Sequence, residues 1–235
     1  MANNMVKHIP NAVTCMNLLS GCIGIYFAFQ GDFQTVLYFV LASGLFDLFD
    51  GMIARILKVH SPMGRELDSL ADVVSFGFLP GVVYFMLLRN AFPENTWLPF
   101  AGFIVTLFSA IRLAKFNLDE RQTTDFIGLN TPMNTFYVMS LPFLAGNIEQ
   151  PAIAQLFSSP YFLFASLLLT SLLLVSEYRL FSMKFKNLGW ADNKYKYMFL
   201  LVSAGLLIGV QLLALPIILM LYFLFSRLHF SKVAA

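Results

Sequence analysis

Charged side chains are scarce in this sequence. Asp, Glu, Lys and Arg make up 12% of its 235 residues, against roughly 25% in an ordinary soluble domain, while hydrophobic residues make up 58%. The mean hydropathy is +0.73, and the apolar residues are spread along the whole chain, so most segments must face lipid or one another. This composition excludes a soluble globular protein and predicts an integral membrane protein.

Cysteine is nearly absent, and the net charge is small. Cys15 and Cys22 lie seven residues apart in one apolar stretch, where two helical turns hold them too far apart for a disulfide, so we interpret them as packing thiols. A net charge of +2 offers no basic surface for nucleic acid, and no nucleic-acid partner is expected. Residues 1–11 are polar and lack the pattern of a cleaved signal peptide, so the first apolar stretch is predicted to be a retained span.

Eight apolar segments follow one another, each about long enough to cross a membrane. We therefore predict an all-α, polytopic integral membrane helix bundle of about eight transmembrane helices. It would form a single membrane-embedded domain over residues 1–235, with a core at about 8–176 and additional C-terminal helices at about 197–228. The eight segments cover residues of about 12–30, 33–57, 67–88, 97–116, 132–148, 160–176, 197–212 and 214–228.

The positions of Lys and Arg favour eight spans. With a cytoplasmic N-terminus, every Lys and Arg except Arg89 then falls on the cytoplasmic side, as the positive-inside rule requires. Seven spans would place Arg227 and Lys232 outside. We therefore expect both termini in the cytoplasm.

Four aspartates interrupt the apolar pattern where the second segment ends and the third begins. A carboxylate inside a span costs roughly 2.5–3.5 kcal/mol on insertion, so each one is a functional hypothesis. Asp47 and Asp50 are three residues apart and Asp68 and Asp72 are four apart, so each pair shares one helix face. Two facing pairs form a cluster that needs cations, and hard oxygen ligands favour Mg²⁺, Mn²⁺ or Ca²⁺. Such a cluster is typical of a two-metal phosphoryl-transfer site.

Small and basic residues flank the aspartates. Gly51 and Gly64 would let a bulky ligand approach the backbone, and Arg55 can neutralise phosphate. Two alternatives give the aspartates another role. They would either form a structural ion-pair network with Arg55, Lys58 and Arg65, or line a cation pathway.

The spacing of these residues resembles the signature of the CDP-alcohol phosphotransferase family at all eight fixed positions. The matching string is Asp47-x2-Asp50-Gly51-x2-Ala54-Arg55-x8-Gly64-x3-Asp68-x3-Asp72. The resemblance implies a six-helix catalytic core that transfers a phosphatidyl or related group from a CDP-linked donor to an alcohol and releases CMP. Members of this family are commonly homodimers, which the resemblance implies here too. A cation transporter stays as an alternative of a different class, although it has no use for the Gly and Ala spacing.

Further segments resemble the phosphatidylserine synthase branch of that family. The resemblance implies CDP-diacylglycerol as the donor, L-serine as the acceptor and membrane lipids as the surroundings. Lys115, Asn130 and Asn134 stand where this branch usually has Arg, Pro and Ala, so glycerol phosphate, inositol phosphate or another alcohol stay as alternative acceptors. The segments are residues 9–21, 74–80, 111–117 and 128–132.

The family resemblance also implies roles for the aspartates. Asp47, Asp50, Asp68 and Asp72 would hold two divalent ions, Mg²⁺ or Mn²⁺. Asp72 would also be the general base, because a serine hydroxyl needs a proton acceptor within hydrogen-bond reach. His60, in the turn between the two pairs, receives no metal role because the oxygen cluster is complete without it.

Contacts to the CDP group follow from the same resemblance. Thr14 and Asn17, one turn apart on the first helix, would add polar contacts to the nucleotide or would instead form hydrogen bonds between helices. The positions that match the CDP contacts of the family are Asp50, Gly51, Ala54, Arg55 and Gly64.

Acceptor-binding residues are expected at the end of the fourth segment. Arg112 and Lys115 share one helix face and would receive the carboxylate of an amino acid, with Asn117 close by. The alternative is that the two basic side chains extend to the membrane surface and only set the topology. Ser69, between Asp68 and Asp72, could support the aspartates.

Overall fold

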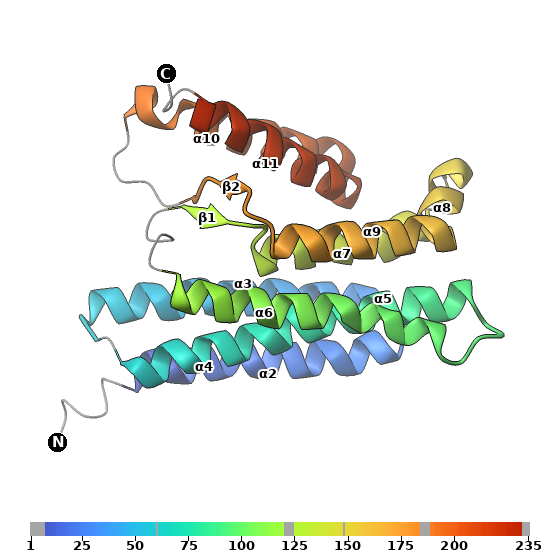
Figure 1. Cartoon of the computed structure of the whole chain (residues 1–235), viewed down its shortest axis with the longest axis horizontal. Helices are drawn as coiled ribbons and strands as arrows, with labels where there is room; N and C mark the ends of the chain where they lie inside the picture. The colour runs from blue at the N-terminus through green and yellow to red at the C-terminus, as the bar shows by residue number, and fades with distance from the viewer. Residues whose placement is uncertain (1–7, 60, 120–124, 148, 184–188, 232–235) are drawn as a thin grey trace.

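Almost all of the described chain is helical. The computed structural model describes residues 8–59, 61–119, 125–147, 149–183 and 189–231. Most of its helices run side by side along the long axis, and α2 begins at the same end of the molecule at which α11 ends (Figure 1). The helices are α2 (Ile9–Phe29), α3 (Phe33–Ile56), α4 (Pro62–Asp72), α5 (Leu79–Ala91), α6 (Ile104–Leu118), α7 (Thr131–Ala145), α8 (Pro151–Ser158), α9 (Pro160–Leu174), α10 (Trp190–Val210) and α11 (Ala214–Ser231).

The helices form three layers in Figure 1. Helices α2 to α6 make one layer, α7 and α9 make the middle layer, and α10 and α11 make the third. Strands β1 (Phe126–Ile127) and β2 (Arg179–Leu180) pair antiparallel beside the middle layer. The sequence did not predict this small sheet, because two-residue strands are too short to show an alternating pattern.

Within the described residues, five helical segments are long and apolar enough to cross a membrane: Ile9–Phe29, Phe33–Ile56, Pro62–Ala91, Leu98–Leu118 and Asp192–Ser231. Helices α8 and α9 make a sixth if the two, bent by 62°, are counted as one span. The expected all-α, polytopic membrane protein is thereby confirmed.

The expected count of eight spans stays a prediction, because the structure is less regular than eight equal segments. Helix α7 covers 15 residues, which is short for a span. The segment Asp192–Ser231 breaks at Gln211, where φ is +50°, and α10 and α11 pack against each other there as a hairpin. One long apolar segment therefore folds back on itself.

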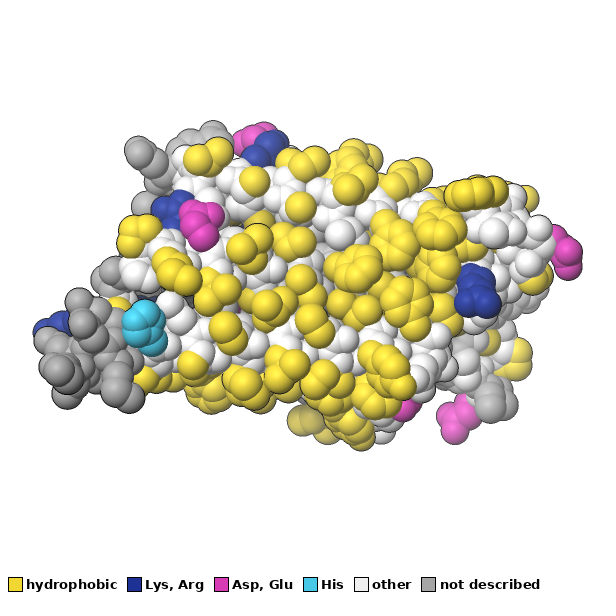
Figure 2. Space-filling model, turned by 90° about the horizontal axis from the view of Figure 1, so that it is seen from below, with side chains coloured by type: hydrophobic (Ala, Val, Ile, Leu, Met, Phe, Trp, Pro, Cys, Tyr) yellow, Lys and Arg dark blue, Asp and Glu magenta, His cyan; other side chains and the backbone are white. Residues whose placement is uncertain are grey.

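The surface matches a membrane protein. Figure 2 shows hydrophobic side chains over the middle of one face, with charged side chains gathered toward its two ends. Among the described residues, Arg89 lies near the end of α5 that points away from the aspartates. Several basic residues on which the topology prediction depends lie outside the described residues, as does His60; the basic ones are Lys7, Arg121, Lys184, Lys186 and Lys232.

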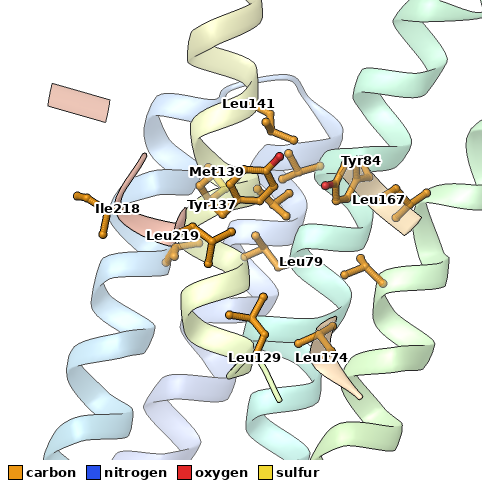
Figure 3. Close-up of a cluster of buried hydrophobic side chains, with 14 of the residues drawn as sticks. Leu79, Tyr84, Leu129, Tyr137, Met139, Leu141, Leu167, Leu174, Ile218 and Leu219 are labelled. Atoms are coloured by element: carbon orange, nitrogen blue, oxygen red, sulfur yellow. The ribbon is translucent and has the colours of Figure 1, made fainter. Parts of the chain in front are cut away.

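The core lies between α5, α7, α9 and α11 (Figure 3). Its buried side chains include Leu79, Met139 and Leu167. Two tyrosine hydroxyls share one partner there: those of Tyr84 and Tyr137 lie 2.8 Å and 2.7 Å from the Ser166 hydroxyl. Since lipid offers no hydrogen-bond partner, this triad satisfies three polar groups and joins three helices.

Capping residues fix where the helices that carry the aspartates begin. The Asp32 carboxylate accepts a hydrogen bond from the backbone N–H of Thr35, and the Ser61 hydroxyl accepts one from that of Gly64. Hydrogen bonds from the Thr35 side chain and backbone lower the pKa of Asp32, which lies outside the spans. Pro62 follows Ser61 at the first turn of α4, a position where its missing N–H costs nothing.

Helices α4 and α5 are joined by a π-helical turn, Val73–Phe78, that starts directly after Asp72. Neighbouring helices bond its polar groups. The Thr106 hydroxyl donates to the carbonyl of Gly77, and the Thr135 hydroxyl donates to that of Phe76, both at 3.0 Å. Such turns are frequent at functional sites. These two hydrogen bonds connect the turn that follows Asp72 to α6 and α7.

Gly128 holds the small sheet against the end of α9. Its backbone N–H donates to the carbonyl of Tyr178 at 2.8 Å, and its φ is +79°, a conformation that favours glycine. A Cβ at this position would lie 2.5 Å from the carbonyl oxygen of Leu174 and 2.9 Å from that of Ser176. The site therefore depends on glycine for both its conformation and its space.

Gly128→Ala should lower the free energy of unfolding by about 1–3 kcal/mol, through the left-handed conformation and the carbonyl contacts. The measurement is the thermal midpoint of the purified protein in detergent. Gly205→Ala is the matched control, because a Cβ there meets no atom of the described chain within 4 Å and alanine is the better helix former. Equal midpoints for the two variants would contradict this account of the sheet.

Candidate active site

The four aspartates meet at the end of the bundle where α3 ends and α4 begins. Carboxylate oxygens of Asp47, Asp50 and Asp68 lie within 4.8 Å of one another. Asp72 lies one helical turn further along α4, is 9% exposed, and is close enough to interact electrostatically with the other three. The spacing thus places both pairs on facing helix surfaces, with three carboxylates forming a compact group and the fourth buried beside it.

Helix α2 orients one aspartate of each pair. The Thr14 hydroxyl donates to Oδ2 of Asp50 at 2.6 Å, and Nδ2 of Asn17 donates to Oδ1 of Asp72 at 3.2 Å. Asn17 is itself held, because its backbone carbonyl accepts hydrogen bonds from the hydroxyls of Ser43 and Ser75. Of the two roles considered for Thr14 and Asn17, the structure displays the hydrogen bonds between helices, and they end on the aspartates.

The donor set fits a divalent cation. Oδ1 of Asp68 is buried and has no hydrogen-bond partner among the described residues. Adjacent carboxylates in a desolvated site repel one another, so they need a compensating positive charge or a proton. Three carboxylates with one oxygen each toward a common point are the hard ligands that Mg²⁺, Mn²⁺ and Ca²⁺ prefer.

A first cavity, of about 440 Å³, lies on one side of the cluster, between the start of α2 and the connection from α3 to α4. Gly51 belongs to its lining, and a Cβ there would meet no atom of the described residues within 4 Å. Packing therefore does not explain this glycine, but free space in the cavity does. The residues of this lining that the sequence singled out are Thr14, Asp50, Gly51, Ala54, Gly64 and Asp68.

Gly64 differs from Gly51. A Cβ there would lie 3.0 Å from both the Asn11 amide oxygen and the Ser61 hydroxyl, so its small size also serves the cap of α4. Arg55 turns its side chain back along α3, and its Nε donates to the carbonyl of Gly51 at 3.0 Å. Arg55 lines the second cavity and not the first.

This second cavity, of about 690 Å³, lies on the other side of the cluster. Four residues line both cavities: Asp50, Gly51, Arg65 and Asp68. Two carboxylates of the cluster, those of Asp50 and Asp68, therefore lie between the two cavities, and Asp47 and Asp72 line the second one only. Polar residues of the second lining include the four aspartates, Arg55, Arg65, Ser69, Arg112, Asn117, Asp119, Asn130 and Thr131.

Arg112 places a buried positive charge in the second cavity. Its side chain is 5% exposed, and its Nε donates to the carbonyl of Leu129 at 2.6 Å. The guanidinium carbon lies 5.5 Å and 5.8 Å from the ring centres of Phe116 and Phe126. Its Nη2 is buried without a hydrogen-bond partner in the described chain. A buried guanidinium with an unused donor is suited to bind an anion, because an unpaired charge is costly to bury.

The other two residues assigned to the acceptor are placed differently. Asn117 lines the second cavity, and its Nδ2 donates to the Ser69 hydroxyl at 2.8 Å while its Oδ1 accepts from Nε of Arg65 at 3.5 Å. It therefore ties α6 to α4 beside the cluster. Lys115 is exposed and lines a separate third cavity behind Arg112, not the second.

The sequence analysis missed the contribution of the C-terminal hairpin. The Tyr222 hydroxyl on α11 donates to the carbonyl of Phe181 at 2.8 Å and interacts with the side chain of Asn130, which lines the second cavity. The hydroxyl of a tyrosine in an apolar span needs a hydrogen-bond partner inside the protein, but the sequence does not identify that partner.

The fold and the site define a helical membrane protein with a cluster of carboxylates next to two cavities at one end of its bundle. A sequence model of the CDP-alcohol phosphatidyltransferase family matches residues 7–177. The chain belongs to this family. The family expected from the aspartate signature is thereby confirmed, and the α10–α11 hairpin lies outside the matched part.

Several curated proteins are similar to the chain. CDP-diacylglycerol--serine O-phosphatidyltransferase of Helicobacter pylori (strain 26695) is 30% identical over 237 aligned positions, which cover 96% of this chain and 92% of that protein. The enzyme of the same name from Bacillus subtilis is 32% identical over 142 positions, 59% of this chain and 77% of its own length. Archaetidylserine synthase of Methanothermobacter thermautotrophicus is 28% identical over 136 positions, 56% of each chain.

Asp68→Asn should weaken Mn²⁺ binding by at least about 10- to 100-fold. Loss of a residue that only hydrogen-bonds to a metal ligand already lowers metal affinity by this factor, and Asp68 would be a ligand itself. Free Mn²⁺ can be followed by electron paramagnetic resonance during titration of the purified protein. Asp32→Asn is the matched control, since Asp32 is an exposed helix cap away from the cluster. Equal affinities for the two variants would contradict the cation site.

Proposed function

We propose that the protein transfers the phosphatidyl group of CDP-diacylglycerol to the hydroxyl of L-serine, giving phosphatidylserine and CMP. The observation that carries the proposal is the cluster of three carboxylates within 4.8 Å of one another, two of which line both cavities, while the second cavity also holds the buried guanidinium of Arg112. The names of the similar proteins support the acceptor, because serine is common to both printed names.

The first cavity would hold the CDP group of the donor. Gly51 and Ala54 line it with little or no side chain, which leaves room for a nucleotide, and Thr14 lines it beside Asp50, to which its hydroxyl donates. The four aspartates would hold two divalent ions, Mg²⁺ or Mn²⁺, which when bound supply positive charge to the diphosphate and to the departing CMP. Arg55, on the side of the second cavity, would neutralise phosphate.

The second cavity would hold the acceptor. Arg112 would receive the serine carboxylate through Nη2, and Asp72 would accept the proton of the hydroxyl. Asn17 holds Oδ1 of Asp72, which leaves Oδ2 for that proton. The serine oxygen then forms its bond to the β-phosphorus as the bond from that phosphorus to CMP breaks, in one in-line displacement.

The remaining expectations concern the surroundings of the site. Described basic residues gather at the end of the bundle that holds the aspartates, including Arg55, Lys58, Arg65, Lys115 and Arg179. By the positive-inside rule this end, with both termini, would face the cytoplasm, so that serine arrives from there and CDP-diacylglycerol from the inner leaflet. A homodimer stays a prediction from the family resemblance.

The deciding experiment offers the purified protein CDP-diacylglycerol with Mg²⁺ or Mn²⁺ and a panel of serine, glycerol 3-phosphate, inositol phosphate and glycerol, and measures CMP release. We expect release to depend on serine and to stop when a chelator removes the metal. Release that is independent of serine would overturn the acceptor. No release with any alcohol from a well-folded sample would overturn the enzyme assignment and leave the cation pathway as the alternative.

Asp72→Asn should lower kcat by about 10²- to 10⁴-fold, because an amide cannot take the proton of the serine hydroxyl. Binding of CDP-diacylglycerol should change far less, since the first cavity is lined by other residues. The measurement compares kcat with the KM for CDP-diacylglycerol, with Asp32→Asn as the control. An equal loss of nucleotide binding and turnover would limit Asp72 to metal binding.

A further inference from the structure

The third cavity, of about 300 Å³, lies behind Arg112, between the end of α6 and the end of α9. Its charged lining residues come from two sides. Arg112, Lys115 and Asp119 belong to α6 and its C-terminal cap, and Glu177 follows α9. The remaining lining residues are Leu118, Ile127, Leu174, Val175 and Ser176.

These charges suit a small zwitterion. Two positive and two negative side chains line the cavity, so that its walls carry no net charge. Glu177 lies on the α9 side of this cavity, and its carboxylate favours a cation there. A phosphate monoester carries nearly two negative charges and would meet Glu177 and Asp119 as well as the cations. An α-amino acid places an ammonium and a carboxylate a few ångströms apart and matches both walls.

The third cavity adjoins the second one. Arg112 and Asp119 line both, and Arg112 carries the buried Nη2 without a hydrogen-bond partner in the described chain. Lys115 and Glu177 are exposed, so the third cavity opens to water at the polar end of the bundle. A water-soluble ligand can therefore reach Arg112 from this side without crossing the apolar surface.

The walls of this cavity are held together before any ligand binds. The backbone N–H of Leu129 donates to the carbonyl of Leu173 at 2.9 Å, and that of Gly128 donates to the carbonyl of Tyr178 at 2.8 Å. The strand pair β1–β2 adds a second connection between the same segments. Prior ordering of a site reduces the entropy lost on binding, which favours recognition of a molecule as small as an amino acid.

We propose that the third cavity is a docking subsite for a zwitterionic α-amino acid, in which Glu177 binds the ammonium group and Arg112 with Lys115 binds the carboxylate. The amino acid passes from this subsite to the second cavity, where Arg112 keeps its carboxylate. This inference rests on the proposed function and adds the class of acceptor that the site selects: alcohols that carry both an ammonium and a carboxylate group.

The test compares Glu177→Gln and Glu177→Lys with the wild-type chain. CMP release is measured against the concentration of L-serine, of glycerate, which lacks the ammonium, and of ethanolamine, which lacks the carboxylate. Glu177→Gln should raise the KM for serine about threefold to tenfold through the loss of a charge-assisted hydrogen bond, with the kcat and the KM for CDP-diacylglycerol unchanged. Glu177→Lys should raise the KM for serine further and should increase the use of glycerate relative to serine.

Glu149→Gln is the matched control, because Glu149 is an exposed glutamate between α7 and α8, at the opposite end of the bundle. If the wild type uses serine but both Glu177 variants match Glu149→Gln in their KM for serine and in their ratio of serine to glycerate, the subsite is wrong while the proposed function stands. If the wild type releases no CMP with serine, the proposed function fails and the subsite with it. Thermal midpoints near that of the wild type exclude misfolding as the cause of a changed KM.

Discussion

Mutual repulsion among four carboxylates is the constraint on which the rest of this structure depends. Asp47, Asp50 and Asp68 hold oxygens within 4.8 Å of one another, and Asp72 is buried beside them. In a site largely removed from water such a group is stable only with donors and cations around it. Helix α2 supplies two donors, Thr14 and Asn17, which explains why a helix without charges in its membrane segment packs against both aspartate-bearing helices.

The position of the cluster decides how the protein can use it. Asp50 and Asp68 line both the first and the second cavity, so a ligand in either one lies next to these two carboxylates, whereas Asp47 and Asp72 line the second cavity alone. The linings differ: Ala54 belongs to the first cavity alone, whereas Arg112, Asn117 and Asn130 belong to the second alone. The second cavity therefore offers a buried positive charge that the first one lacks.

The polar end of the bundle is built from three layers of helices, whose residues lie far apart in the sequence. The signature lies on α3 and α4, the buried guanidinium on α6, and Tyr222 on α11. The Tyr222 hydroxyl donates to the carbonyl of Phe181 and interacts with the side chain of Asn130. Since Tyr222 lies beyond residue 177, the segment outside the family match supports the second cavity. The β1–β2 pair joins these layers next to the third cavity.

The sequence by itself determined the membrane class, the all-α fold, the family and the two aspartate pairs. Hydrophobic runs and helical spacing are local, so residues 47–72 reveal their shared faces without the rest of the chain. Only the tertiary structure decided the orientation of Asp50 and Asp72 by α2, the placement of Lys115 in the third cavity and not in the second, and the contact of Tyr222 with Asn130. The contacts of Asp50, Asp72 and Tyr222 join residues that are 36 to 92 positions apart in the sequence. A local sequence pattern cannot predict which distant residue a buried polar group will contact.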